Sequence, residues 1–157
     1  MVEKSLLQQV KLFGDLKEAE WEELSKITAS KEFIEGDILF SEGDASTEVY
    51  MVMKGEVSIQ IKLAPQLGES TVFTARPFDV IGEFAFVDAK ARSATARCTK
   101  KAVVGVIEKA DFEDIVKRFP AIGLNFYRSV VCLLSDRLRR MNATLRETYL
   151  RFAGLEM

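Results

Sequence analysis

The sequence of 157 residues contains no histidine. Imidazole is the usual general base, the usual partner of serine and cysteine nucleophiles, and the commonest metal ligand among side chains. Its absence excludes much of hydrolase and metalloenzyme chemistry. We therefore expect no catalytic residue, no metal site and no resident cofactor.

Cysteine is also scarce. Cys98 and Cys132 are 34 positions apart and form no CxxC pair, which excludes zinc-ribbon and thioredoxin-like sites. Both lie in apolar stretches, so we expect two buried free thiols in a reducing compartment. The first five residues lack the regions of a signal peptide, and no apolar run is long enough to span a membrane. We expect a cytoplasmic protein without a membrane partner.

Neither sign of charge is in excess. Lys and Arg number 22 against 24 Asp and Glu, so the net charge of -2 gives no general attraction to nucleic acid. Apolar residues make up 48% of the chain, which is enough to bury a core. We expect one domain over residues 1–157, with N-terminal helices in 1–30, a β region in 31–108 and C-terminal helices in 110–152.

The spacing of apolar residues changes along the chain. Helical spacing predicts short helices over 5–13 and 17–28. From Lys31 the period becomes two, and short runs rich in β-branched and aromatic residues are separated by Gly, Asp and Pro. This pattern is typical of a sandwich, barrel or jelly roll. The expected strands are 33–34, 38–40, 49–53, 57–61, 71–74, 80–81, 94–98 and 102–107.

The C-terminal third predicts a short helix over 111–119 and a long one that opens at Pro120. An apolar residue recurs every three or four positions, and at about 1.5 Å per residue the long helix would measure roughly 50 Å. A domain of this size cannot cover such a length. The alternatives are a helix that folds against its own barrel and frays at its end, and a helix that pairs with a second copy in a homodimer, which we expect because the stripe does not stop. The stripe comprises Ile122, Phe126, Val130, Leu134, Leu138, Met141, Leu145, Tyr149 and Phe152.

Two stretches carry possible site chemistry. In the first, Gly36, Gly43 and Gly55 each neighbour an acidic residue between strand-like runs, which is typical of tight turns. In the second, a strand ends at Gly82, a short helix-compatible segment follows, and Arg92 lies at the exit of the next loop. Free N–H groups and a guanidinium would then converge into an anion cradle.

Other members of the second stretch complete this prediction. The N–H groups of Ser93 and Ala94 and the Ser93 hydroxyl are further donors for an anion. The carboxylate of Glu83 would repel a phosphate, so we expect it to bind a different group. A sugar hydroxyl, which can donate a hydrogen bond to a carboxylate, is such a group. Each of these residues also has an ordinary structural interpretation. An arginine on a loop is commonly a solvated charge, and a glutamate at the start of a helix commonly only stabilises that helix.

These motifs, in order over residues 10–150, resemble the cyclic-nucleotide-binding domain of the catabolite activator protein, the regulatory subunits of cyclic-AMP-dependent kinase and cyclic-nucleotide-gated channels. The resemblance implies an eight-stranded jelly roll, a double-stranded β-helix, with a phosphate-binding cassette at 82–95. It also implies that Arg92 pairs with the cyclic phosphate and Glu83 with the ribose 2'-hydroxyl. The implied backbone and packing positions are Gly82, Phe84, Ala85, Ser93 and Ala94, and those near the purine are Arg137, Asn142 and Met141.

The sequence departs from this family in two places. Arg76-Pro77-Phe78-Asp79 stands where the family generally has Pro-Gly-Asp, and no helix-turn-helix follows the long helix, so we expect no DNA partner. The arginines of that helix are interrupted by acidic residues, which favours a solvated or inter-subunit face. They are Arg137, Arg139, Arg140, Arg146 and Arg151.

Three functions follow as alternatives. The first is a sensor that binds a cyclic nucleotide, cyclic AMP before cyclic GMP or cyclic di-GMP, and signals to an unidentified downstream protein. The second is an interaction module that keeps the fold without the ligand. The third is a cupin-like enzyme, which the lack of histidine disfavours.

Overall fold

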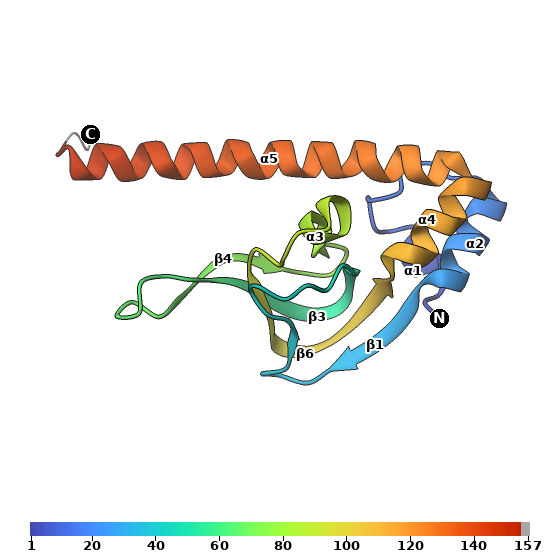
Figure 1. Cartoon of the computed structure of the whole chain (residues 1–157), viewed down its shortest axis with the longest axis horizontal. Coiled ribbons are helices and arrows are strands. Elements are labelled where there is room, and N and C mark those ends of the chain that lie inside the picture. The colour runs from blue at the N-terminus through green and yellow to red at the C-terminus, as the bar shows by residue number, and fades with distance from the viewer. Residues whose placement is uncertain (155–157) are drawn as a thin grey trace.

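The computed structural model describes residues 1–154, which form five helices and six strands (Figure 1). The helices are α1 (Lys4–Leu7), α2 (Glu18–Ile27), α3 (Glu83–Asp88), α4 (Lys109–Arg118) and α5 (Pro120–Phe152). The strands are β1 (Ala29–Phe33), β2 (Ile38–Phe40), β3 (Val49–Lys62), β4 (Glu69–Ala75), β5 (Val80–Ile81) and β6 (Thr95–Ile107).

All strand pairs are antiparallel and are built around two long strands. The main order is β1-β6-β3-β4, while β2 also pairs with β6 and β5 also pairs with β3. The two long strands curve beneath α3, and α5 passes over α3 and continues beyond it (Figure 1). The expectation of a mainly β fold with flanking helices is therefore confirmed.

The expected count of eight strands is not confirmed, because two pairs of predicted strands are continuous. Segments 49–53 and 57–61 lie in the two halves of β3, while 102–107 and all but the first residue of 94–98 lie in β6. The register of β3 against β6 shifts between Val52 and Val57. A β-bulge bends a strand without ending its pairing, so a turn-like sequence signal there does not separate two strands.

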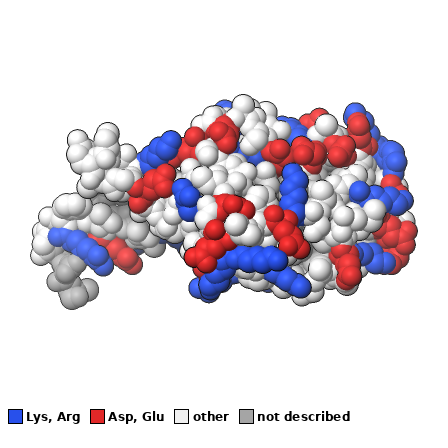
Figure 2. All heavy atoms as spheres, turned by 90° about the horizontal axis from the view of Figure 1, so that it is seen from below, with Lys and Arg blue, Asp and Glu red and all other residues white. Residues whose placement is uncertain are grey.

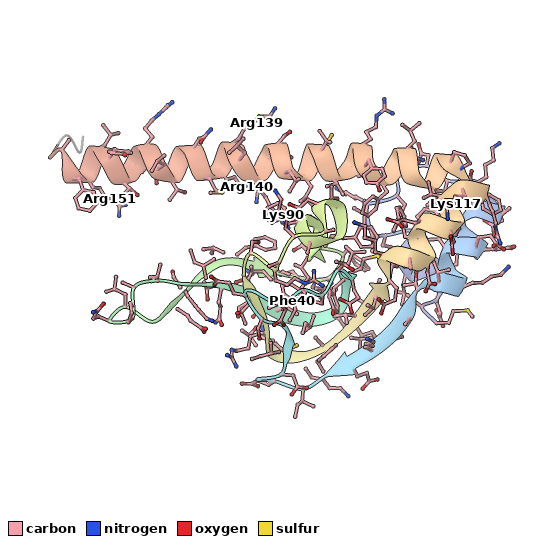
Figure 3. The ribbon with its side chains drawn as sticks, in the orientation of Figure 1. Phe40, Lys90, Lys117, Arg139, Arg140 and Arg151 are labelled. Atoms are coloured by element: carbon pink, nitrogen blue, oxygen red, sulfur yellow. The ribbon has the colours of Figure 1, made fainter. Side chains whose placement is uncertain are left out.

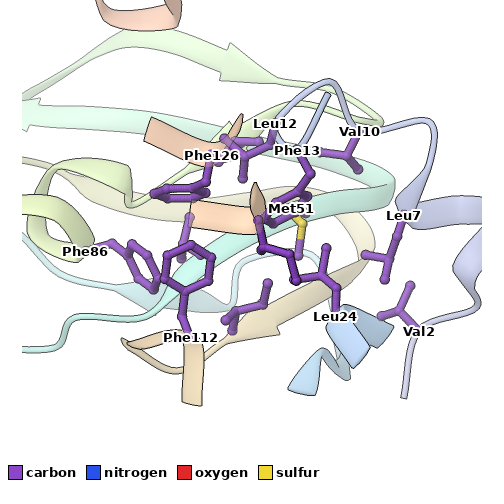
Figure 4. Close-up of a cluster of buried hydrophobic side chains, with 14 of the residues drawn as sticks. Val2, Leu7, Val10, Leu12, Phe13, Leu24, Met51, Phe86, Phe112 and Phe126 are labelled. Carbon is purple, nitrogen blue, oxygen red and sulfur yellow. The ribbon is translucent and has the colours of Figure 1, made fainter. Parts of the chain in front are cut away.

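Buried side chains form two clusters, one on each side of the first half of β3. Val49 and Met51 pack against the helices, whereas Tyr50 and Val52 face the interior of the curved sheet. This alternation follows from the two-residue period of a strand. The helical cluster is rich in aromatic rings: the centroid of Phe126 lies 4.6 Å from that of Phe112 and 5.2 Å from that of Phe86 (Figure 4).

The predicted N-terminal helix over 5–13 is wrong beyond Leu7. Val10, Leu12 and Phe13 are all buried, although an α-helix would point positions 10 and 12 about 200° apart. An irregular backbone, followed by Gly14 at a φ of 59°, lets all three side chains reach the core. Tertiary burial here overrides the local pattern.

Helices α4 and α5 remain separate because of Pro120. The residue before a proline is sterically kept out of the helical region, and Phe119 accordingly has a φ of -130° and a ψ of 75°. The first half of α5 buries Ile122, Phe126 and Val130.

Cys132 lies on the other side of this helix and is exposed, so the expectation of two buried thiols is wrong for Cys132 and confirmed for Cys98. No helix within residues 1–154 is long and apolar enough to cross a membrane.

Substitution of Gly55 tests whether the bulge of β3 packs closely against β6. Its φ is 85°, and an added Cβ would lie 2.1 Å from the carbonyl oxygen of Lys101. We expect Gly55→Ala to lower the free energy of unfolding by about 3 kcal/mol, from backbone strain and overlap together. Gly36→Ala is the matched control, because its φ is 91° but nothing lies within 4 Å of the added Cβ. Urea denaturation should show a loss of about 1 kcal/mol for the control, and equal losses would contradict the packing argument.

Candidate functional site

The cassette begins at Gly82, between β5 and α3. Its φ is 80°, which a residue with a side chain rarely adopts. A Cβ at this position would lie 2.6 Å from Nη1 of Arg92 and 3.1 Å from the carbonyl oxygen of Glu48. Glycine is therefore needed here both for the backbone conformation and for the close approach of the guanidinium.

Arg92 points inward from the loop after α3, and its side chain is 1% exposed. Its Nη1 donates to the carbonyl oxygen of Gly82 at 3.0 Å, and its Nε donates to the hydroxyl of Ser46 at 2.9 Å. Its Nη2 donates to Glu48 twice, to the carbonyl oxygen at 2.9 Å and to the carboxylate at 3.0 Å. A buried guanidinium needs such partners, because an unpaired buried charge is strongly destabilising.

Aromatic rings and backbone bonds also hold Arg92. The guanidinium carbon lies 4.2 Å from the ring centroid of Phe40 and 5.7 Å from that of Tyr50. The backbone N–H of Arg92 donates to the carbonyl of Asp44, and that of Gly43 donates to the carbonyl of Arg92. Burial lowers the pKa of Arg92, and the neighbouring anionic groups oppose this. The first glycine and acidic stretch of the sequence thus helps to position the arginine of the second.

Glu83, the first residue of α3, is 2% exposed and forms an ion pair with Nη1 of Arg137 from α5. Nη2 of Arg137 donates to the carbonyl oxygen of Val80 at 3.0 Å, and its guanidinium lies 5.0 Å from the ring centroid of Phe73. Burial raises the pKa of Glu83 above its usual 4.5, while the charge of Arg137 acts in the opposite direction. The ion pair therefore links α5 directly to the cassette.

The structure brings only some of the predicted site residues together. Gly82, Glu83, Arg92 and Arg137 lie within one network of contacts. Ala85 and Ala94 of the cassette are also buried. The other predicted residues are exposed: Phe84, Ser93, Met141 and Asn142. Asn142 lies five residues beyond Arg137, or about 7.5 Å further along the helix axis.

The turn before the cassette keeps a glycine-like conformation at a residue that is not glycine. Phe78 has a φ of 74°, and its N–H donates to the carbonyl of Val52 at 2.7 Å. Asp79 accepts a hydrogen bond from the N–H of Arg76 at 2.9 Å, which closes the turn. The ring of Phe78 packs against the helical core cluster, and this burial offsets the strained backbone.

The residues that surround the two arginines carry no recognisable signal in the sequence. Ser46 and Glu48 come from the loop before β3, Phe40 from β2 and Phe73 from β4. Burial raises the pKa of Tyr50 to about 12, with the carboxylate of Glu48 adding to the effect. An acidic residue just before a strand is too common to signal such a contact, because the strand pairing that creates it is not visible in the sequence.

The arginines of α5 do not form one basic face. Arg137 is paired with Glu83, and Arg139 is paired with Asp136 at 2.9 Å. Arg139 and Arg140 point to opposite sides of the helix (Figure 3). Figure 2 views the molecule from below, on the side away from most of α5, and on that face too Lys and Arg are interspersed with Asp and Glu. This arrangement lacks the one-sided positive charge typical of nucleic-acid binding.

Comparison with known proteins identifies the family. The sequence profile for the cyclic nucleotide-binding domain matches residues 30–119, which is more than half of the chain. The chain belongs to the cyclic nucleotide-binding domain family. The match includes the loop before β3, the whole cassette and α4, but ends before α5.

Relatives of this domain occur in larger proteins. A neuropathy target esterase of Drosophila willistoni is 26% identical over 151 residues, which cover 92% of this chain and 10% of that protein. The chain thus spans about a tenth of the length of such relatives.

Two solved structures share the fold. The catabolite activator protein of Thermus thermophilus matches with a TM-score of 0.75 and 23% identity, over 89% of this chain and 63% of that one. The regulatory domain of Toxoplasma gondii PKA, crystallised with cAMP, matches with a TM-score of 0.66 and 25% identity. That match covers 73% of this chain and 43% of the other.

The raised pKa of Glu83 predicts a specific pH dependence. Because the fold favours the protonated carboxyl, its contribution to stability is complete below the unfolded pKa and falls as the pH rises through the folded pKa. The unfolding free energy of the wild type minus that of Glu83→Gln should therefore decrease from about pH 4 towards pH 7. Urea denaturation across this range measures the difference. Repeating it in an Arg137→Met background should give a steeper decrease, and a difference that grows with pH would contradict the prediction.

Proposed function

We propose that this cyclic nucleotide-binding domain is a regulatory sensor that binds cyclic AMP in the cassette and relays binding through α5. Arg92 takes the cyclic phosphate and Glu83 accepts the ribose 2'-hydroxyl. The observation that carries the proposal is that a buried cation, Arg92, bonds to the carbonyl of Gly82, and that the next residue, Glu83, is a buried carboxylate. Burial of two ionisable groups at one small site is costly, and such sites are commonly functional.

The remaining cassette positions complete the proposed site. Buried Ala85 and Ala94 leave room for a close approach of the ligand, and the Ser93 hydroxyl and N–H groups add donors to the phosphate. On α5, Arg137 already reaches Glu83, and Met141 and Asn142 follow it on the same helix towards the purine side. A ligand that bonds to Glu83 therefore acts on the contact that holds α5 to the cassette, which is the proposed route of the signal.

Removal of the Arg92 guanidinium tests the ligand assignment. We expect Arg92→Ala to weaken cyclic AMP binding about 10²- to 10⁴-fold, because the phosphate loses its charged partner. Isothermal titration calorimetry with cyclic AMP, cyclic GMP and cyclic di-GMP measures both affinity and selectivity. Lys90→Ala is the matched control, because Lys90 lies in the same loop and its side chain is 81% exposed. This variant should bind cyclic AMP with the affinity of the wild type. Equal affinities for wild type and Arg92→Ala would refute the site.

The ligand panel also separates the alternatives. Preferred binding of cyclic GMP or cyclic di-GMP would keep the site and change the nucleotide. Failure of all three nucleotides to bind would favour an interaction module of the same fold, with α5 as its output.

We further propose that a second copy of the chain covers the outer half of α5. Beyond Arg137 this helix exposes a row of apolar side chains at three- and four-residue spacing, the pattern of a two-helix contact. Their exposed fractions are large: Leu138 58%, Met141 68%, Leu145 55%, Tyr149 68% and Phe152 89%.

A charge placed in this row tests the dimer. Leu145→Glu should produce a monomer, because a carboxylate in the centre of an apolar helix pair is left desolvated. Ala143→Glu places the same carboxylate on the opposite side of α5, about 200° away, and should remain a dimer. Sedimentation equilibrium of the wild type and both variants gives the masses. A monomeric wild type, or equal effects of the two variants, would contradict the proposal.

A further inference from the structure

Glu48 supplies the charged acceptor of the Arg92 guanidinium. The four hydrogen bonds of Arg92 to described residues end on two backbone carbonyls, one hydroxyl and the Glu48 carboxylate. A guanidinium has five N–H groups, so these bonds account for four of them. A phosphate that binds the guanidinium through two parallel N–H groups must therefore displace at least one of the present acceptors of Arg92.

The groups around Arg92 differ in how readily they can move. The rings of Phe40 and Tyr50 are buried at 6% and 5% exposure, and the carbonyl of Gly82 is fixed at the start of α3. The side chain of Glu48 is 23% exposed, whereas that of Arg92 is 1% exposed. The carboxylate thus lies at the solvent side of the pair and can rotate into water without opening the core.

We propose that Glu48 competes with the ligand phosphate for Arg92 and so sets the affinity of the site. This inference rests on the proposed function, in which Arg92 binds the phosphate. A carboxylate and a phosphate cannot share one guanidinium edge without strong mutual repulsion. Binding therefore requires the carboxylate of Glu48 to release one N–H group of Nη2. The backbone carbonyls of Gly82 and Glu48 keep their own bonds to Nη1 and Nη2 and hold the guanidinium in place.

This competition favours a ligand that makes further contacts besides those of its phosphate. A free phosphate gains the Arg92 N–H group that the Glu48 carboxylate gives up and the donors at Ser93, but it must displace the carboxylate to do so. A cyclic nucleotide adds a hydroxyl contact to Glu83 and base contacts to α5, and these make the exchange favourable. Glu48 is thus a specificity-determining residue that discriminates against simple anions.

The test measures cyclic AMP and inorganic phosphate binding by calorimetry for the wild type, Glu48→Gln and Glu48→Ala. Both substitutions remove the competing charge, so we expect cyclic AMP to bind at least about tenfold more tightly than to the wild type. Phosphate binding should become measurable in the same variants. Glu32→Gln makes the same change of net charge at a side chain that is 66% exposed, and should bind as the wild type does.

The outcomes separate this inference from the proposed function. If Glu48 instead positions Arg92, both variants should bind cyclic AMP more weakly than the wild type, and Glu48→Ala more weakly than Glu48→Gln. That result, or unchanged affinity, would overturn the inference and leave the proposed function standing. Tighter binding by the variants supports the inference even where wild-type binding is too weak to measure. Failure of every folded variant to bind any cyclic nucleotide would overturn both.

Discussion

The buried guanidinium of Arg92 is the constraint on which the rest of the site depends. A charge removed from water is stable only where its N–H groups find acceptors, and here those acceptors come from separate parts of the chain. The loop before β3 provides Ser46 and Glu48, while the start of α3 provides the carbonyl of Gly82. One side chain thereby fixes the relative positions of a strand entry, a helix start and the loop that carries it.

The second ion pair follows from the first through geometry. The bond from Arg92 to the carbonyl of Gly82 fixes the beginning of α3, and the next residue, Glu83, is consequently directed into the protein. A buried carboxylate in turn needs a cation, and Arg137 of α5 supplies it from 54 positions further along the chain. The pair therefore joins segments that are distant in sequence, and it does so at the point where α5 leaves the core.

The sequence predicts the parts of this arrangement that depend on local pattern. Period-two runs, turn glycines and the helical stripe predict a mainly β fold with flanking helices. The cassette motif predicts that Arg92 and Glu83 are ligand-binding residues. The sequence does not show that a bulge at Gly55 keeps β3 continuous, because a bulge and a turn use the same residues. It also cannot show Glu48 beside Arg92, since that contact arises only when residues 44 positions apart are brought together by strand pairing.

Helix α5 has two halves with different physical surroundings, and Arg137 lies at their boundary. Before it, Ile122, Phe126 and Val130 are buried in the helical cluster, so this half is held by apolar packing. After it, the apolar side chains of the stripe are exposed, so the core does not hold this half of the helix. The Glu83–Arg137 ion pair therefore fastens α5 to the cassette where the buried half ends. In the proposed function, a ligand that alters the bonding of Glu83 changes that contact without disturbing the buried half, which lets a small chemical event at the cassette affect the exposed half of the helix.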